Sequence, residues 1–261
     1  VFREPESPGV CTGYVPCAVG VPALSAERLM RILPRDKTGA LLKAADSGFS
    51  ADRAYEFVRQ LLDTDVDVAA ILIDTSHPAS VAAARSNTEL VNQRRQAVHH
   101  RKMTEAGFSY GIFAGQLITD LLMASLERTG CRPTFFDVVL DNAALKAVQE
   151  RQWRDWLRAA GANNDTSVGD VVWTSEQAEP LLLLPDLVAG ILLRDAVAGD
   201  CQRARQALQD AGRAGRLSIR DGYNIPLPQQ APDAHDVPQS RVSVNGSAQL
   251  HNAADDAPPR S

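Results

Sequence analysis

Carboxylates at the ends of predicted apolar segments are the residues of this sequence with the clearest chemical potential. Asp74 ends one apolar segment, Asp141 ends a second, and Asp186 stands early in a Leu-rich segment. Glu4 and Glu6 lie just before the first predicted strand. In an open α/β sheet, strand ends and helix N-termini meet at one edge. Carboxylates meeting there would form an oxygen-rich site suited to Mg²⁺ or Mn²⁺. Two such metals about 4 Å apart would support in-line hydrolysis of a phosphodiester.

The same aspartates also have a structural explanation. Asp is a preferred residue at a helix N-cap and in the first helical turn, where it stabilises a helix by about 1 kcal/mol. Both explanations stay open for Asp141 and Asp186. A structural role is favoured for Asp74, which belongs to no motif, because loops after strands are commonly acidic.

Basic residues give a weaker indication of function. A cluster between positions 94 and 102 consists of Arg94, Arg95, His99, His100, Arg101 and Lys102. On a helix it could follow a phosphate backbone, but its charges divide between two faces, as on a solvated helix. Lys43 stands alone in a segment without regular structure and by itself would be assigned to the surface. We find no G-x-S-x-G elbow, P-loop or strand followed by G-x-G-x-x-G.

Strands that alternate with helices must position these residues, and the hydrophobic pattern predicts them. Strands are expected over Tyr14–Val21, Val66–Ile73, Thr134–Leu140 and Asp170–Trp173, with an edge strand at Leu217–Ile219. Helices are expected over Ala26–Ile32 with Ser25 as N-cap, from the cap Ser50 through Leu62, from Pro78 to Arg128 with a break near Gly107, over Asn142–Ala160 ending at Gly161, over Pro180–Val197 and over Cys201–Ala211. We expect the first four strands in one sheet with helices packed against it, an α/β layer fold.

Composition limits the class of protein. The 261 residues are 44% hydrophobic and 23% charged, enough for a core without metal or disulfide. The net charge of −5 does not favour nucleic acid as a partner, except through a local basic patch. The four cysteines lack zinc-site spacing and are expected to be reduced thiols of a cytoplasmic protein. The most apolar run, Leu181–Leu193, is too short to span a membrane, and no signal peptide is evident.

The C-terminal part of the chain differs in composition. From about Pro226 onward Pro, Gln, Asp, Asn and Ser dominate, and large apolar residues nearly vanish. Such a segment cannot bury enough surface to offset its ordering entropy. We therefore expect an α/β domain over residues 1–225 and a disordered tail over residues 226–261.

Several segments together resemble the bacterial family called domain of unknown function 3800, which has an RNase H-like fold. The clearest match is Glu179–Gly190, preceded by Ser175, which is similar to the closing segment of the family. The strand that ends in Val138–Asp141 and the segment Gly13–Pro22 also look like family strands. The resemblance spans roughly Glu4 to Ile219. It implies a mixed RNase H-like sheet flanked by helices.

The resemblance also implies a function. It implies a divalent-metal-dependent nuclease in which Glu6, Asp141 and Asp186 hold Mg²⁺ or Mn²⁺ and Lys43 contacts a phosphate of a nucleic acid. The chain departs from the family at the opening Asp-Glu-Ser-Gly motif, where Arg3–Gly9 lacks the leading Asp. Of the family's Glu-x-Lys element only the lysine remains. A catalytically degenerate binding or interaction module of the same fold is therefore an equal alternative, which the acidic net charge favours.

One prediction concerns the tail. Truncation after Pro226 should leave the melting temperature unchanged, because the removed residues contribute almost no apolar surface to a core. Thermal unfolding of the full and the shortened chain measures this. A large decrease on truncation would show that the tail packs on the domain.

Overall fold

The computed structural model describes residues 13–74, 105–142 and 150–221, together with residues 89, 92, 93 and 96. The chain divides into two compact units, Val1–Asn224 and Ile225–Ser261, and the described residues all lie in the first. Glu6, the basic cluster and the expected tail lie outside the described residues.

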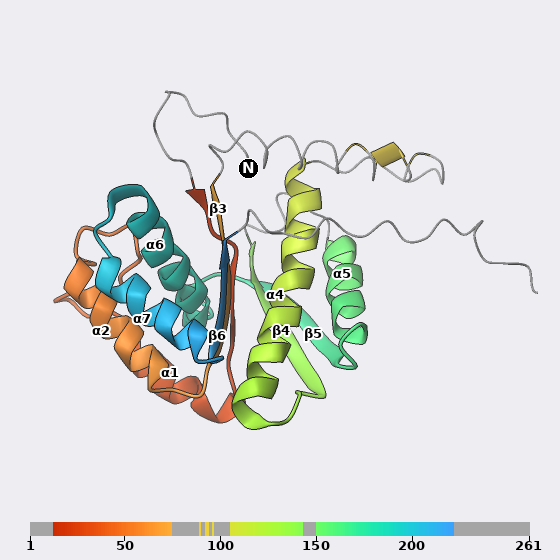
Figure 1. Ribbon diagram of the computed structural model, residues 1–261, viewed down its shortest axis with the longest axis horizontal. Coiled ribbons are helices and arrows are strands. Elements are labelled where there is room, and N and C mark those ends of the chain that lie inside the picture. The colour runs from red at the N-terminus through yellow and green to blue at the C-terminus, as the bar shows by residue number, and fades with distance from the viewer. Residues whose placement is uncertain are drawn as a thin grey trace, which may run out of the picture. The chain divides into compact units, whose positions relative to one another are not determined.

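Strands and helices alternate along the first unit, as an α/β fold requires (Figure 1). The strands are β1 Gly13–Tyr14, β2 Cys17–Gly20, β3 Asp67–Asp74, β4 Phe135–Asp141, β5 Ser167–Thr174 and β6 Leu217–Asp221. The helices are α1 Ala26–Ile32, α2 Ala51–Leu62, α4 Glu105–Thr129, α5 Glu150–Ala162, α6 Leu183–Ala198 and α7 Gln202–Arg213, with single 3₁₀ turns at Ala23–Ser25 (η1) and Pro180–Leu182 (η3). The predicted strands and helices are thus confirmed in type wherever the structure describes them.

The larger sheet is built around β3. β1 and β2 pair with one edge of β3 in antiparallel orientation, and β6 pairs with the other edge in parallel. The predicted first strand is interrupted at Pro16, which has no N–H to give to the sheet but accepts the N–H of Ile71 at 3.0 Å. Residues 68–71 of β3 are at most 1% exposed. The prediction of a strand buried on both faces is confirmed.

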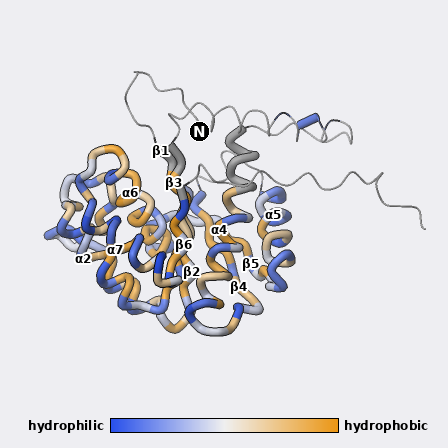
Figure 2. The backbone as a smooth tube through the Cα atoms, in the orientation of Figure 1, coloured by the Kyte–Doolittle hydropathy of each residue, from blue (hydrophilic) through white to orange (hydrophobic). Residues whose placement is uncertain are grey.

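Helices cover both faces of this sheet. α6 contacts β1, β2 and β3, and α7 contacts β6 and α2, whereas α4 contacts β2, β3 and β6 from the other side (Figure 1). α6 is apolar along most of its length, while α2 and α7 carry more polar residues away from the core (Figure 2). No helix among the described residues is both long and apolar enough to cross a membrane.

The second sheet corrects one expectation. β4 and β5 pair in parallel as a separate two-stranded sheet, so the prediction that the first four strands share one sheet is wrong. Alternate residues of β4 face a core of their own, in which Trp153 and Leu157 of α5 meet Ile118 of α4. Because this small core already buries one face of β4 and β5, these strands have packing that does not depend on pairing with the larger sheet.

Two local predictions about helices are wrong. Ser25 does not cap α1 with its side chain, because it lies in the helical region at the end of η1. α4 continues through Gly107, since a helix tolerates a glycine at a cost of about 1 kcal/mol. The predicted end of α5 at Gly161 is confirmed within one residue, because the helix ends at Ala162. The predicted cap Ser50 is confirmed, with its hydroxyl accepting the N–H of Arg53 at 3.3 Å.

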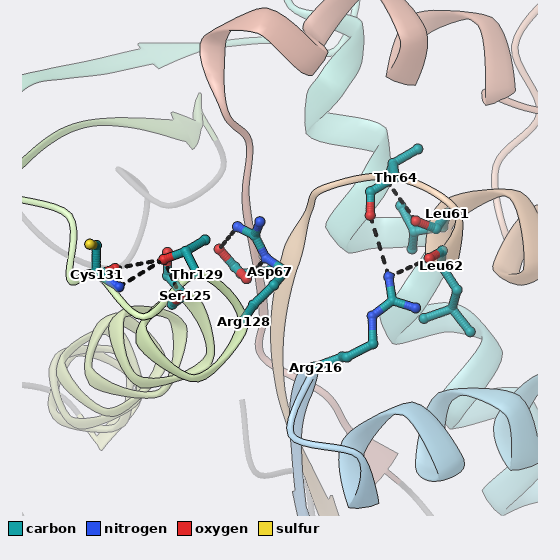
Figure 3. Close-up of polar contacts among 9 residues, drawn as sticks. All are labelled: Leu61, Leu62, Thr64, Asp67, Ser125, Arg128, Thr129, Cys131 and Arg216. Carbon is teal, nitrogen blue, oxygen red and sulfur yellow. Dashed lines mark hydrogen bonds and ion pairs between the residues drawn. The ribbon is translucent and has the colours of Figure 1, made fainter.

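Two arginines fix the surrounding elements to the larger sheet (Figure 3). Arg128 near the end of α4 donates from Nε and Nη2 to the two carboxylate oxygens of Asp67 on β3, each at 2.9 Å. The two side chains are only 19% and 8% exposed. Arg216 donates to the carbonyl oxygens of Leu62 and Thr64 and so ties the start of β6 to the turn between α2 and β3.

The Arg128–Asp67 pair gives a stability prediction. Arg128→Met should lower the free energy of unfolding by about 3 kcal/mol, because it leaves the largely buried Asp67 carboxylate unpaired. Arg213→Met is the matched control: Arg213 pairs with Asp210 at the surface, where such pairs contribute at most about 1 kcal/mol. Urea unfolding of both variants measures the difference, and equal losses would contradict the structural role of the buried pair.

Candidate carboxylate–lysine site

Lys43 lies in the segment between α1 and α2 and contacts a carboxylate from a distant part of the chain. Its Nζ is 2.5 Å from Oε2 of Glu176, which follows the end of β5 by two residues. The hydrogen bond to Glu176 raises the pKa of Lys43, and the charges of Glu176, Asp186 and Asp141 add to this effect, while partial burial opposes it. The ammonium group of Lys43 therefore contacts Glu176 and is influenced by the charges of two further carboxylates.

Asp186 is the carboxylate whose ionisation is most perturbed. It lies in the first turn of α6, where the helix dipole favours the ionised form. Its pKa is nevertheless raised. The main cause is partial desolvation of the carboxyl group, although the residue as a whole is exposed, and the second cause is the charge of Glu176. Asp141 raises it further, whereas Lys43 and the N–H of Ala44 lower it. Desolvation and like charges thus outweigh the helix dipole.

Asp141 is the last residue of β4 and is exposed. Its charge raises the pKa values of both Asp186 and Lys43, so the strand end and the start of α6 belong to one electrostatic cluster. A purely local role, in which each aspartate serves only its own helix, does not account for this coupling. The charges of Asp141, Asp186 and Lys43 thus act on one another, and Lys43 makes a direct contact with Glu176.

Cys17 on β2 adds a thiol beside the same cluster. It is a free cysteine, as are Cys131 and Cys201. Burial, and then the charge of Asp186, raise the pKa of Cys17 well above its usual range. The thiolate is the form that attacks electrophiles and binds metals. Cys17, which packs against the large core, is therefore neutral and unsuited to act as a nucleophile.

Three predicted carboxylates are not placed at this site, and one carboxylate of the site was not predicted. Glu4 and Glu6 lie outside the described residues; Asp74 pairs through its backbone with Gly13 at the end of β3, and its side chain is not described. Glu176 was not singled out in the sequence. The signal was present, because Glu176 follows a strand directly, as Asp141 ends one. The predicted strand ends at Trp173, one residue before the end of β5.

The donor atoms fit a hard divalent cation in kind but not in number. Carboxylate oxygens are the ligands that Mg²⁺ and Mn²⁺ prefer. Within residues 13–74, 105–142 and 150–221, however, no three His, Cys, Asp or Glu side chains are grouped closely enough to hold a metal ion. The described carboxylates therefore supply only part of a ligand set for a metal ion. One of them, Glu176, is already paired with Lys43.

The raised pKa of Asp186 predicts an unusual response to mutation. A carboxyl group whose pKa is higher in the folded state binds protons more tightly there, so stability falls as pH rises through the range between its unfolded and folded pKa values. Asp186→Asn should remove this dependence and stabilise the chain at pH 7, by less than about 1 kcal/mol because the group is partly exposed. Thermal unfolding between pH 3 and pH 8 measures the effect. Asp170→Asn is the control, because Asp170 is an exposed residue of β5. Destabilisation at pH 7 would refute the electrostatic description.

Comparison of the chain with protein-family models, with curated proteins and with solved structures gives no match. A function must therefore be argued from the chemistry of the site itself, because the α/β architecture is compatible with many activities. The residues that carry this chemistry are Lys43, Asp141, Glu176 and Asp186.

Proposed function

We propose that this chain is an RNase H-like protein that acts on the phosphodiester backbone of nucleic acid with the help of Mg²⁺ or Mn²⁺. The Lys43–Glu176 contact, together with the mutual charge effects of Lys43, Asp141 and Asp186, is the observation that supports it. These residues come from four separate segments of the chain. Groups of mutually perturbed carboxylates are typical of functional sites, although structural ion pairs also perturb pKa values.

Each residue of the cluster has a role that follows from its chemistry. Asp141 and Asp186 offer oxygen ligands from a strand end and a helix start, and Glu6 would supply the third carboxylate, as the family resemblance implies. Lys43 offers an ammonium group that can bind a phosphate oxygen once Glu176 releases it. A bound divalent cation would supply the charge that polarises the phosphoryl group and activates water.

The electrostatics of the cluster favours a cation as its ligand. Like charges and partial burial raise the pKa of Asp186, and the single ammonium of Lys43 only partly offsets them. A divalent cation would relieve this repulsion.

The proposal extends to the fold and the location of the chain. In the larger sheet β3 pairs in antiparallel orientation with β2 and in parallel with β6, as in a mixed sheet, which supports the proposed fold. The separate sheet of β4 and β5 counts against an RNase H-like arrangement, for which the four predicted strands are expected in one sheet. The three free cysteines fit a cytoplasmic location, where thiols stay reduced.

A binding or interaction module of the same fold is the second candidate. It is favoured by the Lys43–Glu176 ion pair, which already engages the lysine, and by the incomplete ligand set among the described residues. The net charge of −5 also weakens general attraction to nucleic acid. In this case the cluster would serve recognition or stability without hydrolysis.

A metal titration tests the proposal. Mn²⁺ at millimolar concentration should raise the melting temperature of the chain by several degrees, because a ligand that binds only the folded state stabilises it by mass action. Asp141→Asn should abolish this rise, whereas Asp170→Asn should retain it. Cleavage of single-stranded and duplex DNA and RNA in the presence of Mn²⁺ should depend on Asp141 and Asp186 in the same way.

Two other outcomes would decide against hydrolysis. Binding of nucleic acid without cleavage, unaffected by Mn²⁺, would favour the interaction module. Cleavage that persists in both Asp141→Asn and Asp186→Asn would place any nuclease activity elsewhere.

A further inference from the structure

The segment that carries Lys43 is held to α6 at three points on one face of the helix. The contacts come from Asp186, Gly190 and Arg194, which are spaced four residues apart and therefore lie one above the other. The carboxyl of Asp186 lies beside the backbone N–H of Ala44. The other two contacts lie further along α6, outside the carboxylate–lysine site.

Gly190 permits a close approach between the helix and the segment. A Cβ added at Gly190 would lie 2.1 Å from the Cβ of Ala44, which is far inside van der Waals contact. Ala44 is buried. Any side chain at position 190 must therefore push residues 43–49 away from α6.

Arg194 holds the same segment by its backbone. Its Nη1 donates to the carbonyl oxygens of Phe49 at 2.6 Å and Ala44 at 3.3 Å. Its Nε donates to Asp200 at 3.2 Å, which orients the guanidinium group. Carbonyl groups at both ends of the segment are thus bonded to a single side chain.

The segment itself is also constrained. The Asp46 side chain accepts the N–H of Lys43 at 2.7 Å, and the Asp46 carbonyl accepts the N–H of Phe49 at 2.9 Å. The Phe49 side chain is 1% exposed in the core. The backbone position from which the Lys43 side chain extends is therefore fixed by these contacts.

We infer that Arg194 is a positioning residue of the carboxylate–lysine site, which acts through the backbone of residues 44–49 to hold Lys43 against Glu176. It lies two turns beyond Asp186, about 12 Å along the axis of α6. The inference deepens the proposed function and rests on it for the purpose of the site. The positioning itself requires neither metal nor catalysis.

Zero-length cross-linking tests the positioning. A water-soluble carbodiimide converts the Glu176 carboxyl into an O-acylisourea. The Lys43 amine attacks its carbonyl carbon, the urea leaves, and an isopeptide bond forms only where the two groups touch. Peptide mass spectrometry of the full chain measures the yield. Arg194→Gln and Gly190→Ala should each lower the Lys43–Glu176 yield at least fivefold, by loss of hydrogen bonds and by steric displacement respectively. Arg205→Gln is the matched control, because Arg205 of α7 donates to Asp195 of α6 at 2.9 Å and does not bond the segment of Lys43 in the described contacts. The cross-link yield of this variant should stay near that of the wild type.

The outcomes separate this inference from the proposed function. A wild-type yield in folded Arg194→Gln, or no cross-link in the wild-type chain, would overturn the positioning role. If Arg194→Gln does not fold, as judged by circular dichroism, Gly190→Ala decides in the same way. If the yields fall as expected but Mn²⁺ causes no thermal shift, the proposed function fails and the positioning of Lys43 by α6 stands.

Discussion

Burial of α6 is the interaction on which the rest of this structure depends. Six of its apolar side chains are at most 1% exposed: Leu183, Leu184, Leu187, Val188, Ile191 and Leu192. Each buried side chain of this size contributes roughly 1.5–3 kcal/mol before the entropy of ordering is counted. Only three residues of this helix are charged, and each one has a defined task. Asp186 joins the carboxylates, Arg194 holds the segment of Lys43, and Asp195 pairs with Arg205 of α7.

The charge balance of the cluster sets the order in which ligands could enter it. The charges of three carboxylates act on one ammonium group, so the cluster carries an excess of negative charge that repels a phosphate. In the proposed function, a cation would therefore bind before a polyanion approaches. The acidic net charge of the whole chain acts in the same direction.

Local patterns in the sequence were sufficient to predict the elements but not their assembly. The period of apolar residues gave the type of each described strand and helix, and Ser50 gave a helix start, because these signals act over a few residues. Gly161 lies one residue before the end of α5, whereas Gly107 lies inside α4, because a single glycine only weakly opposes a helix. The division into two sheets depends on pairing between distant segments, which no local pattern encodes. The rule that strand ends carry functional carboxylates found Asp141 and would have found Glu176, but the pairing of Glu176 with Lys43 joins distant segments and could not be predicted from it.

The two separate cores have a consequence for cooperativity. Asp141 is attached to the small core under β4 and β5, whereas Lys43 and Asp186 are attached to the large core around α6. Parts of a protein with their own cores can open at different free energies, and hydrogen exchange detects them as separate cooperative units. Local opening of the part built on the small core would separate Asp141 from the cluster while the part built on the large core stays folded. The lifetime of the intact cluster is then set by the less stable of these two parts. Amide hydrogen exchange in β4, compared with that in β3, measures the difference.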